Sequence, residues 1–193
     1  MPVALSFEEL KDFLSKQPVP CLVALEGFME AGKSTVTEAL GELLGYKVFH
    51  TDNLLDTARS GSYRNRVDVV QLRKLLEVVN GRALIEGICL RWVLADAGIT
   101  PDCYLYVKRI QKQGNRWDDG QDLEDFEAGE DVYVRNALSN TRGVAKLMLP
   151  GGCDPDERQI QEAEAFYIET LRYHRDCKPH ERADFIFERI EGP

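Results

Sequence analysis

Short apolar runs alternate with amphipathic segments along most of the chain, and this alternation predicts an α/β protein. Some runs, such as ALIEGI, are almost entirely apolar, which is typical of strands buried on both faces of a parallel sheet. We predict a single domain over residues 1–193 with a five-stranded parallel sheet and helices on both faces. The predicted strands are Cys21–Glu26, Tyr46–His50, Ala83–Ile88, a run within Pro101–Ile110, and Phe185–Ile190.

Helical spacing of apolar residues separates these strands. Ser6–Glu9 reads SFEE, a capping box that predicts the first helix. Leucine and valine spacings of three and four predict a second helix from near Lys33 to Leu44, ended by Gly45, and a third over Val69–Val79. Asp154-Pro155 opens a last helix.

One long segment, Gln111–Gly152, departs from this pattern and is interpreted as a lid insertion. Within it, Asn115–Asp131 contains eight acidic residues and one basic residue. A mobile or partly helical lid over a bound nucleotide would explain this composition, and so would a solvated acidic loop. The two are compatible because a lid must detach and reattach. Val134–Leu147 is the candidate lid helix, and Arg142 within it is a candidate phosphate contact.

Composition excludes several classes of function. The formal net charge of −9 argues against a nucleic-acid-binding surface. No run approaches the roughly 18 apolar residues that a membrane span needs, and the opening residues lack the pattern of a secretory signal. The five cysteines are scattered and odd in number, which favours reduced thiols. We therefore expect a cytoplasmic protein that binds neither membranes nor nucleic acids.

The clearest chemical signal is Gly27–Ser34, which reads GFMEAGKS and matches the phosphate-binding loop G-x-x-x-x-G-K-S. A strand precedes it and a helix follows, as that loop requires. The loop amides would cradle phosphates, Lys33 would reach the β- and γ-phosphates, and the Ser34 hydroxyl would bind Mg²⁺. Glu30 is an unusual acid inside such a loop and is expected to point to solvent. The predicted nucleotide contacts are Gly27, Ala31, Gly32, Lys33, Ser34 and Thr35.

Two carboxylates follow neighbouring strands, where ligands of open parallel sheets bind. Asp52 is a candidate catalytic base or Mg²⁺ partner, or else the cap of a helix that begins at Leu54. Glu86 ends an apolar strand, so it must be paired, solvated or bound to a cation, and Mg²⁺ on a nucleotide is the economical partner. The polar run Arg59–Arg66 is either an acceptor contact or a solvated loop. We interpret His174 as a packed helix residue.

Together these stretches resemble the uridine kinase and phosphoribulokinase group of P-loop kinases, which includes nicotinamide riboside kinases and pantothenate-type kinases. The resemblance is carried by GFMEAGKST, HTDN and LIEGI, with ERADFIF near the end, and it is weak across the lid. It implies a P-loop NTPase fold with ATP and Mg²⁺ as cofactors. It further implies that Asp52 takes the acceptor proton, that Lys33 stabilises the transferring phosphoryl group, and that Ser34 and Glu86, with Asp52, hold Mg²⁺.

The chain departs from that group in its acidic lid, which is not typical, and at two places in the core. Many members have two acids after the second strand, whereas this chain has only Asp52 there. Their paired arginines after the fourth strand correspond only loosely to Lys108-Arg109, which makes Arg109 a candidate nucleotide contact.

We predict an ATP-dependent small-molecule kinase that phosphorylates a hydroxyl of a nucleoside-like or related metabolite. A GTPase-type or regulatory nucleotide-binding protein is the first alternative. Asn115–Asp118 resembles the guanine-recognition pattern N-K-x-D, although the third strand carries no D-x-x-G. A non-catalytic nucleotide-binding module is the second alternative.

Overall fold

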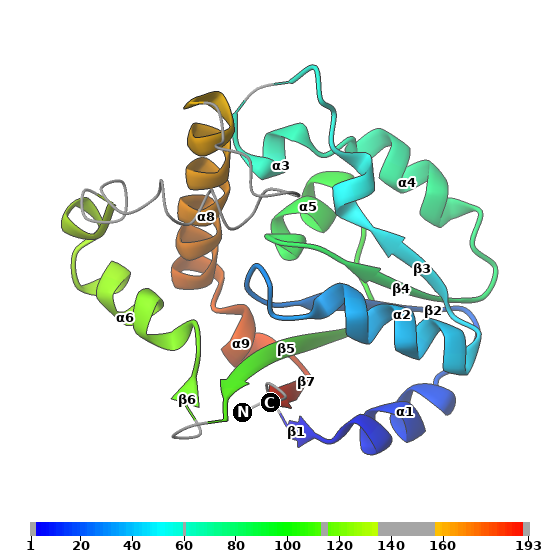
Figure 1. Ribbon diagram of the computed structural model, residues 1–193. Helices are drawn as coiled ribbons and strands as arrows, with labels where there is room; N and C mark the ends of the chain where they lie inside the picture. Colours follow the sequence, from blue (N-terminus) through cyan, green and yellow to red (C-terminus); the bar gives the residue numbers. More distant parts are fainter. Residues whose placement is uncertain (1–2, 60, 113–115, 135–156, 191–193) are drawn as a thin grey trace.

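The computed structural model describes residues 3–59, 61–112, 116–134 and 157–190 of the 193. Figure 1 shows a central sheet with helices on both of its faces. Arg142, all but one residue of the predicted lid helix Val134–Leu147, and the predicted helix start at Asp154-Pro155 lie outside the described residues.

The sheet has seven strands in the order β1-β7-β5-β2-β4-β3, with β6 paired to β5. Every pairing is parallel except that of β6 with β5. The α/β fold and all five predicted strands are confirmed, but the count of five is corrected to seven. The two added strands have only three and two residues, too few to leave a recognisable pattern. The strands are β1 Val3–Leu5, β2 Cys21–Glu26, β3 Lys47–His50, β4 Arg82–Glu86, β5 Cys103–Gln111, β6 Arg116–Trp117 and β7 Phe185–Ile190.

The helices follow the predicted caps where those were visible. Ser6 and Glu9 make both bonds of the capping box at the start of α1. Gly45, with φ of 68°, ends α2 in the left-handed conformation. The short helices α3 and α9, and the eight-residue α5, were not expected. The helices are α1 Phe7–Ser15, α2 Lys33–Leu44, α3 Tyr63–Arg66, α4 Val69–Glu77, α5 Leu90–Ala97, α6 Gly120–Ala128, α8 Glu157–Cys177 and α9 Pro179–Arg182, with a 3₁₀ turn, η1, at Thr51–Leu54.

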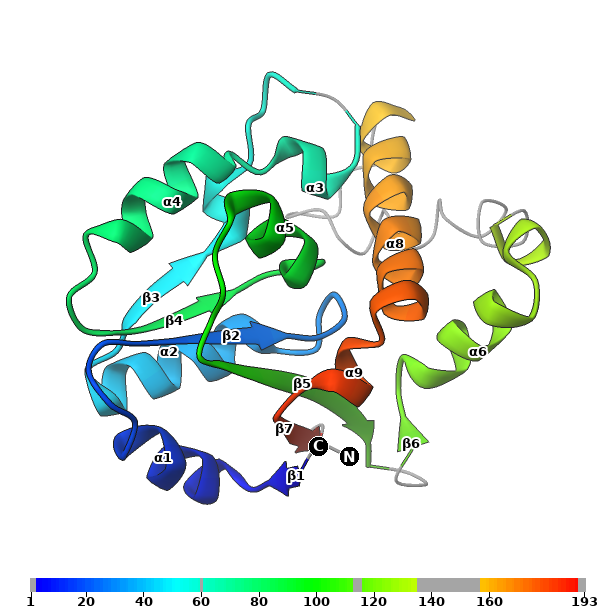
Figure 2. The same cartoon turned by 180° about the vertical axis from the view of Figure 1, so that it is seen from behind.

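Alternating side chains of the central strands supply a separate core on each face of the sheet. Val23 and Leu25 of β2 are buried with residues of α1 and α2. Ala24, between them, is buried on the opposite face with residues of α4 and α5. Figures 1 and 2 show α2 and α5 on opposite faces. This sandwich fixes β2, and therefore the loop that follows it.

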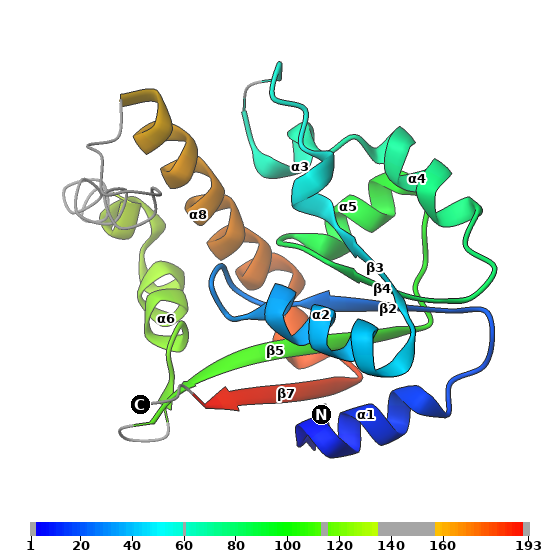
Figure 3. The same ribbon diagram turned by 45° about the vertical axis from the view of Figure 1, so that its right-hand side comes forward.

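The acidic segment is more ordered than a solvated loop. Its helix α6 buries Leu123 and Phe126, which pack with Phe28 of the glycine loop and Leu171 of α8. Figure 3 shows α6 beside α8, at the end of the sheet toward which β5 and β7 point. The interpretation as a wholly solvated loop is therefore wrong for α6.

Two further findings concern membrane-spanning helices and cysteines. Within the described part of the chain, no helix is long and apolar enough to cross a membrane. Four cysteines there, Cys21, Cys89, Cys103 and Cys177, carry free thiols. Cys153 lies outside the described residues.

Candidate functional site

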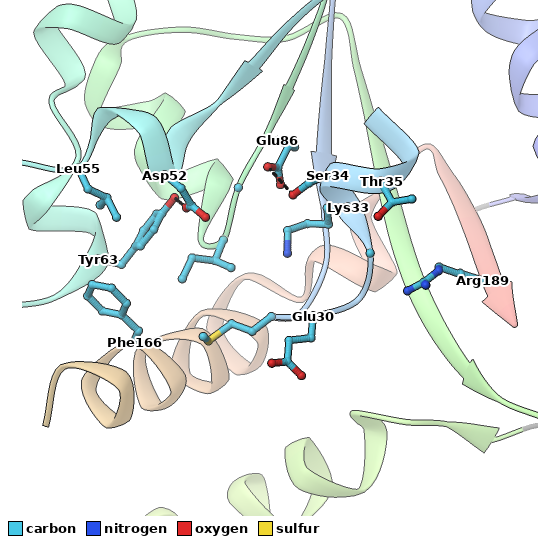
Figure 4. Close-up of a pocket in the computed structure, with 14 residues that line it drawn as sticks. Glu30, Lys33, Ser34, Thr35, Asp52, Leu55, Tyr63, Glu86, Phe166 and Arg189 are labelled. Carbon is cyan, nitrogen blue, oxygen red and sulfur yellow. Dashed lines mark hydrogen bonds between the residues drawn. The ribbon is translucent and has the colours of Figure 1, made fainter. Parts of the chain in front are cut away.

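A pocket of about 450 Å³ lies where β2, β3 and β4 end, and Figure 4 shows the side chains that surround it. Six predicted site residues line it: Gly32, Lys33, Ser34, Thr35, Asp52 and Glu86. Gly27 and Ala31 belong to the loop but not to the pocket lining, and Ala31 is buried in the core beneath it. The remaining lining residues are Met29, Glu30, Leu55, Tyr63, Gly87, Ile88, Phe166 and Arg189.

The glycine loop joins β2 to the N-terminus of α2, so the positive end of that helix faces the pocket. Gly32 has a φ of 87°, and a Cβ there would lie 2.5 Å from Nη1 of Arg189. A side chain would therefore clash as well as strain the backbone. The Glu30 side chain is 62% exposed, so it points to solvent as expected.

Lys33 is buried at the floor of the pocket, with 6% of its surface exposed. Its Nζ donates a hydrogen bond to the carbonyl oxygen of Phe28 at 2.7 Å. Burial lowers the pKa of Lys33, while the nearby charges of Glu86 and Asp52 oppose that shift. An ammonium group has three donors, so two remain for other acceptors such as phosphate oxygens.

Glu86 is paired, one of the three outcomes expected for it. Its Oε1 accepts a hydrogen bond from Ser34 Oγ at 3.0 Å and lies 2.6 Å from Nδ1 of His50. Nε2 of His50 lies 2.7 Å from Oε1 of Glu38 on α2. Burial by itself lowers the pKa of His50, but the hydrogen bonds to Glu86 and Glu38 outweigh it and raise that pKa. The sequence reasoning missed His50 and Glu38 as members of the site.

The oxygen donors at this point suit Mg²⁺. The Ser34 hydroxyl and the Glu86 carboxylate are hard oxygen donors of the kind that Mg²⁺ prefers, and they lie 3.0 Å apart beside the glycine loop. Among the described residues, no group of three or more His, Cys, Asp or Glu side chains is arranged to hold a metal unaided. Mg²⁺ commonly takes one or two protein ligands and completes its shell with phosphate oxygens and water. The residues present therefore fit an ion that arrives with a nucleotide.

Asp52 lies in the η1 turn, and its side chain is held by a tyrosine. Its Oδ1 accepts a hydrogen bond from the Tyr63 hydroxyl at 2.5 Å. The Thr51 hydroxyl lies 2.5 Å from the same tyrosine oxygen and donates to the Glu86 carbonyl at 3.1 Å. A Cβ on Gly87 would lie 1.8 Å from Thr51 Oγ1, so only glycine permits this approach. No helix begins at Leu54 in the described part of the chain: Asp52 lies inside η1, where its carbonyl oxygen accepts the Leu55 N–H but its side chain makes no capping bond. The interpretation of Asp52 as a helix cap is therefore wrong.

One residue of the polar run Arg59–Arg66, Tyr63, lines the pocket. Tyr63 is 1% exposed and Arg66 is 7% exposed, so the solvated-loop interpretation is wrong for these two residues. Arg66 lies over the ring of Phe166 of α8, with its Cζ 5.2 Å from the ring centroid. The Tyr63 and Phe166 rings meet edge to face with centroids 5.5 Å apart. Aromatic side chains thus border the region around Asp52.

The two arginines at the other side of the loop differ from expectation. Arg109 of β5 pairs with Asp118 and, at 3.3 Å, with Asp119, and it does not line the pocket. Its register partner on β7, Arg189, lines the pocket and was not predicted. Burial raises the pKa of Asp119 to about 6, although the charge of Arg109 opposes the rise. The only sequence signal for Arg189 was its place near the end of the last predicted strand.

His174 is packed, as interpreted from the sequence. It is fully buried, and its ring stacks on that of Phe28 with centroids 3.7 Å apart. Its Nε2 lies 3.0 Å from the Tyr106 hydroxyl. Burial lowers the pKa of His174 to about 3, so the ring is neutral in the folded protein.

Comparison with known proteins supports the fold. No protein-family model matches the sequence, and no curated protein matches it. A solved structure from Bacillus stearothermophilus, described as a possible uridine kinase, aligns with a TM-score of 0.50 and 15% identity over 93% of this chain and 98% of that one. A proposed fructose transport system kinase from Silicibacter sp. TM1040 aligns with a TM-score of 0.50 and 17% identity over 95% of this chain and 99% of that one. At such identities the likeness establishes the P-loop kinase fold and nothing finer.

Proposed function

We propose that this protein is an ATP- and Mg²⁺-dependent kinase that transfers the γ-phosphoryl group to a hydroxyl of an uncharged, nucleoside-like small molecule. One observation carries the proposal. Lys33, Ser34 and Glu86 on the loop side, and Asp52 on the opposite side, line the same pocket. The two solved structures of similar fold bear names of small-molecule kinases, which agrees with the proposal.

The nucleotide side would neutralise phosphate charge. The α2 N-terminus and Lys33 would bind the phosphate oxygens, and Ser34 and Glu86 would hold Mg²⁺. When bound, that ion neutralises charge on the β- and γ-phosphates. Positioning and charge neutralisation supply most of the catalysis in phosphoryl transfer.

Asp52 would accept the proton of the acceptor hydroxyl. Tyr63 holds Oδ1, and no hydrogen bond to Oδ2 is made within the described part of the chain. An acceptor hydroxyl can therefore donate to Oδ2. As its oxygen bonds to the γ-phosphorus, the bond from that phosphorus to the β–γ bridging oxygen breaks, ADP leaves, and Asp52 takes the proton.

The wall around Asp52 favours an uncharged acceptor that carries a ring. Leu55, Ile88 and Phe166 line this part of the pocket. The lining cations are Lys33 and Arg189, which both lie on the nucleotide side. Arg66 lies over the ring of Phe166 and does not line the pocket. An acceptor with a carboxylate or phosphate would thus meet no lining cation of its own among the described residues.

The test is ADP release with Mg²⁺ and ATP against a panel of nucleosides, vitamin alcohols, sugars and anionic alcohols. Stimulation by a ring-bearing neutral alcohol, lost in Lys33→Ala and Asp52→Asn, is the expected result. ATP binding that depends on Lys33, with no stimulation by any acceptor, would contradict the kinase proposal and leave a regulatory binder. A preference for GTP over ATP would revive the GTPase alternative, but Asp118 of its recognition pattern is engaged by Arg109.

A further inference from the structure

The carboxylate of Glu86 lies at the end of a short hydrogen-bonded chain that reaches the surface. Glu86 is buried, with 4% of its side chain exposed, His50 is 20% exposed and Glu38 is 63% exposed. The chain runs from Glu86 Oε1 to His50 Nδ1 at 2.6 Å, and from His50 Nε2 to Glu38 Oε1 at 2.7 Å. The proposed reaction uses Glu86 but assigns no role to the other two residues.

The fold places these three side chains together in two independent ways. His50 and Glu86 are register partners on the parallel strands β3 and β4. Ser34 and Glu38 are four residues apart on α2, so they share one face of that helix. The imidazole thus lies between the sheet edge and the same helix face that carries Ser34.

We propose that His50, backed by Glu38, is a positioning residue that fixes the Glu86 carboxylate for the Mg²⁺ that enters with the nucleotide. The inference rests on the proposed function, because it assumes that Glu86 serves the metal. It adds two residues of this chain to the machinery that would hold the ion.

The physical reason is that few other groups among the described residues hold the Glu86 carboxylate in place. Oε1 of Glu86 is shared by Ser34 and His50. A Ser34 hydroxyl that served Mg²⁺ would have to reorient its oxygen toward the ion, whereas His50 would keep its contact with Oε1 and orient the carboxylate. Partners in the outer shell that orient a metal ligand typically change metal affinity by about 10- to 100-fold when removed.

A matched pair of substitutions separates this role from mere packing. In His50→Asn the amide nitrogen occupies nearly the position of Nδ1, so the bond to Glu86 can persist. In His50→Gln the amide nitrogen is nearer the position of Nε2, so the bond to Glu38 persists while that to Glu86 is lost. A packing role predicts similar losses from both, whereas the positioning role predicts that only His50→Gln weakens the metal.

The measurement is the affinity for Mn²⁺, detected by electron paramagnetic resonance, in the presence of an ATP analogue that cannot be hydrolysed. We expect His50→Gln to weaken Mn²⁺ binding about 10- to 100-fold and His50→Asn, which loses only the contact to Glu38, by no more than about fivefold. Glu38→Gln should weaken it about two- to fivefold. Glu42→Gln, an exposed acid four residues further along α2, should leave it unchanged. Thermal unfolding and metal-free analogue binding should match the wild type in every variant.

The outcomes distinguish the inference from the function beneath it. If wild-type protein binds Mn²⁺ with the analogue and both His50 variants equal it, or both lose affinity equally, the positioning role is overturned and the kinase proposal stands. If the wild type shows no metal binding with the analogue, both proposals are overturned. Weakening in His50→Gln with rescue in His50→Asn supports the positioning role.

Discussion

The two sides of the phosphate-binding loop differ in how their charges are arranged. Toward β3 and β4, Ser34, Glu86 and His50 form a connected set of oxygen and nitrogen groups beside the pocket. Toward β5, the guanidinium of Arg109 is already paired with Asp118 and Asp119. The first side places oxygen and nitrogen atoms beside the pocket. On the second side, carboxylates neutralise the positive charge of Arg109.

This difference shows that charged residues near a loop do not contribute equally to binding. A phosphate that approached Arg109 would compete with carboxylates already in place, which reduces the net gain. Arg189 lies against Gly32 in the pocket, and no ion pair to it occurs among the described residues. We therefore expect the side of the loop that carries Ser34 and Glu86, together with Arg189, to contribute more to nucleotide binding than Arg109 does. Four predictions test this asymmetry, from the largest expected effect to the smallest.

Asp52→Asn removes the proposed proton acceptor on the β3 side while keeping the size of the side chain. We expect phosphoryl transfer to fall about 10²- to 10⁴-fold, as for loss of a general base. MgATP affinity should change little, because the acid faces the acceptor. Initial rates and equilibrium binding check this together, with Asn53→Ala as the adjacent control. Full transfer activity in Asp52→Asn would remove the assignment as base.

His174→Gln tests the packed β5 side through the pH dependence of stability. The pKa of His174 is lowered to about 3 in the folded state from 6.5, so below pH 6.5 the unfolded chain binds a proton that the folded chain does not. Stability should fall toward acid by up to about 1.4 kcal/mol per pH unit from this group. Urea unfolding between pH 6.5 and 4.5 should show a smaller slope in the variant. An unchanged slope would contradict the buried, neutral state of the ring.

Arg189→Ala should weaken ATP binding about tenfold, the effect of losing one charge-assisted hydrogen bond. Arg109→Ala should weaken it less, because its guanidinium already pairs with acids. Fluorescence titration with a labelled nucleotide compares the two directly. Arg189→Lys is the charge-conserving control. A larger loss in Arg109→Ala would reverse the assignment of the two sides.

Asp118→Asn should release Arg109 in part and tighten ATP binding about two- to fivefold, since partly exposed ion pairs contribute at most about 1 kcal/mol. Glu124→Gln, an exposed acid on α6, removes the same charge without touching Arg109 and serves as the control. Equal tightening in both variants would mean that net charge alone is responsible. The same nucleotide titration measures both.

The predictable parts were those fixed by local pattern. The strand before Gly27–Ser34 and the helix after it, the capping box at Ser6–Glu9 and the end of α2 at Gly45 follow from spacing and caps, and the structure has all of them. The helix α5 was missed because its eight residues lie in an apolar stretch where a helix and a strand look alike. The surroundings of Arg66 were missed because a charged residue is normally taken as exposed.

The site residues likewise divide into those that the sequence pattern predicted and those that it did not. Lys33, Ser34, Asp52 and Glu86 could be named because each follows a predicted strand at the sheet edge where ligands bind. Tyr63 could be named only as one member of the polar run Arg59–Arg66, with a solvated loop as the alternative. His50 and Arg189 could not be named, since their contacts join residues 36 and 157 positions apart. A pattern confined to neighbouring residues carries no information on such pairs.

The sequence by itself determined the phosphate-binding loop, because a turn that brings amides to a phosphate demands glycine and a following helix at fixed spacing. Only the tertiary structure decided which charged side chains lie where they can contact a ligand in the pocket. The register of β3 on β4 sets His50 against Glu86, and the register of β5 on β7 sets Arg109 beside Arg189. Arg109 pairs with Asp118, which follows β5, whereas Arg189 lines the pocket beside the loop. Strand order and register fix the distances between these residues. The contacts therefore exist only after the sheet has formed.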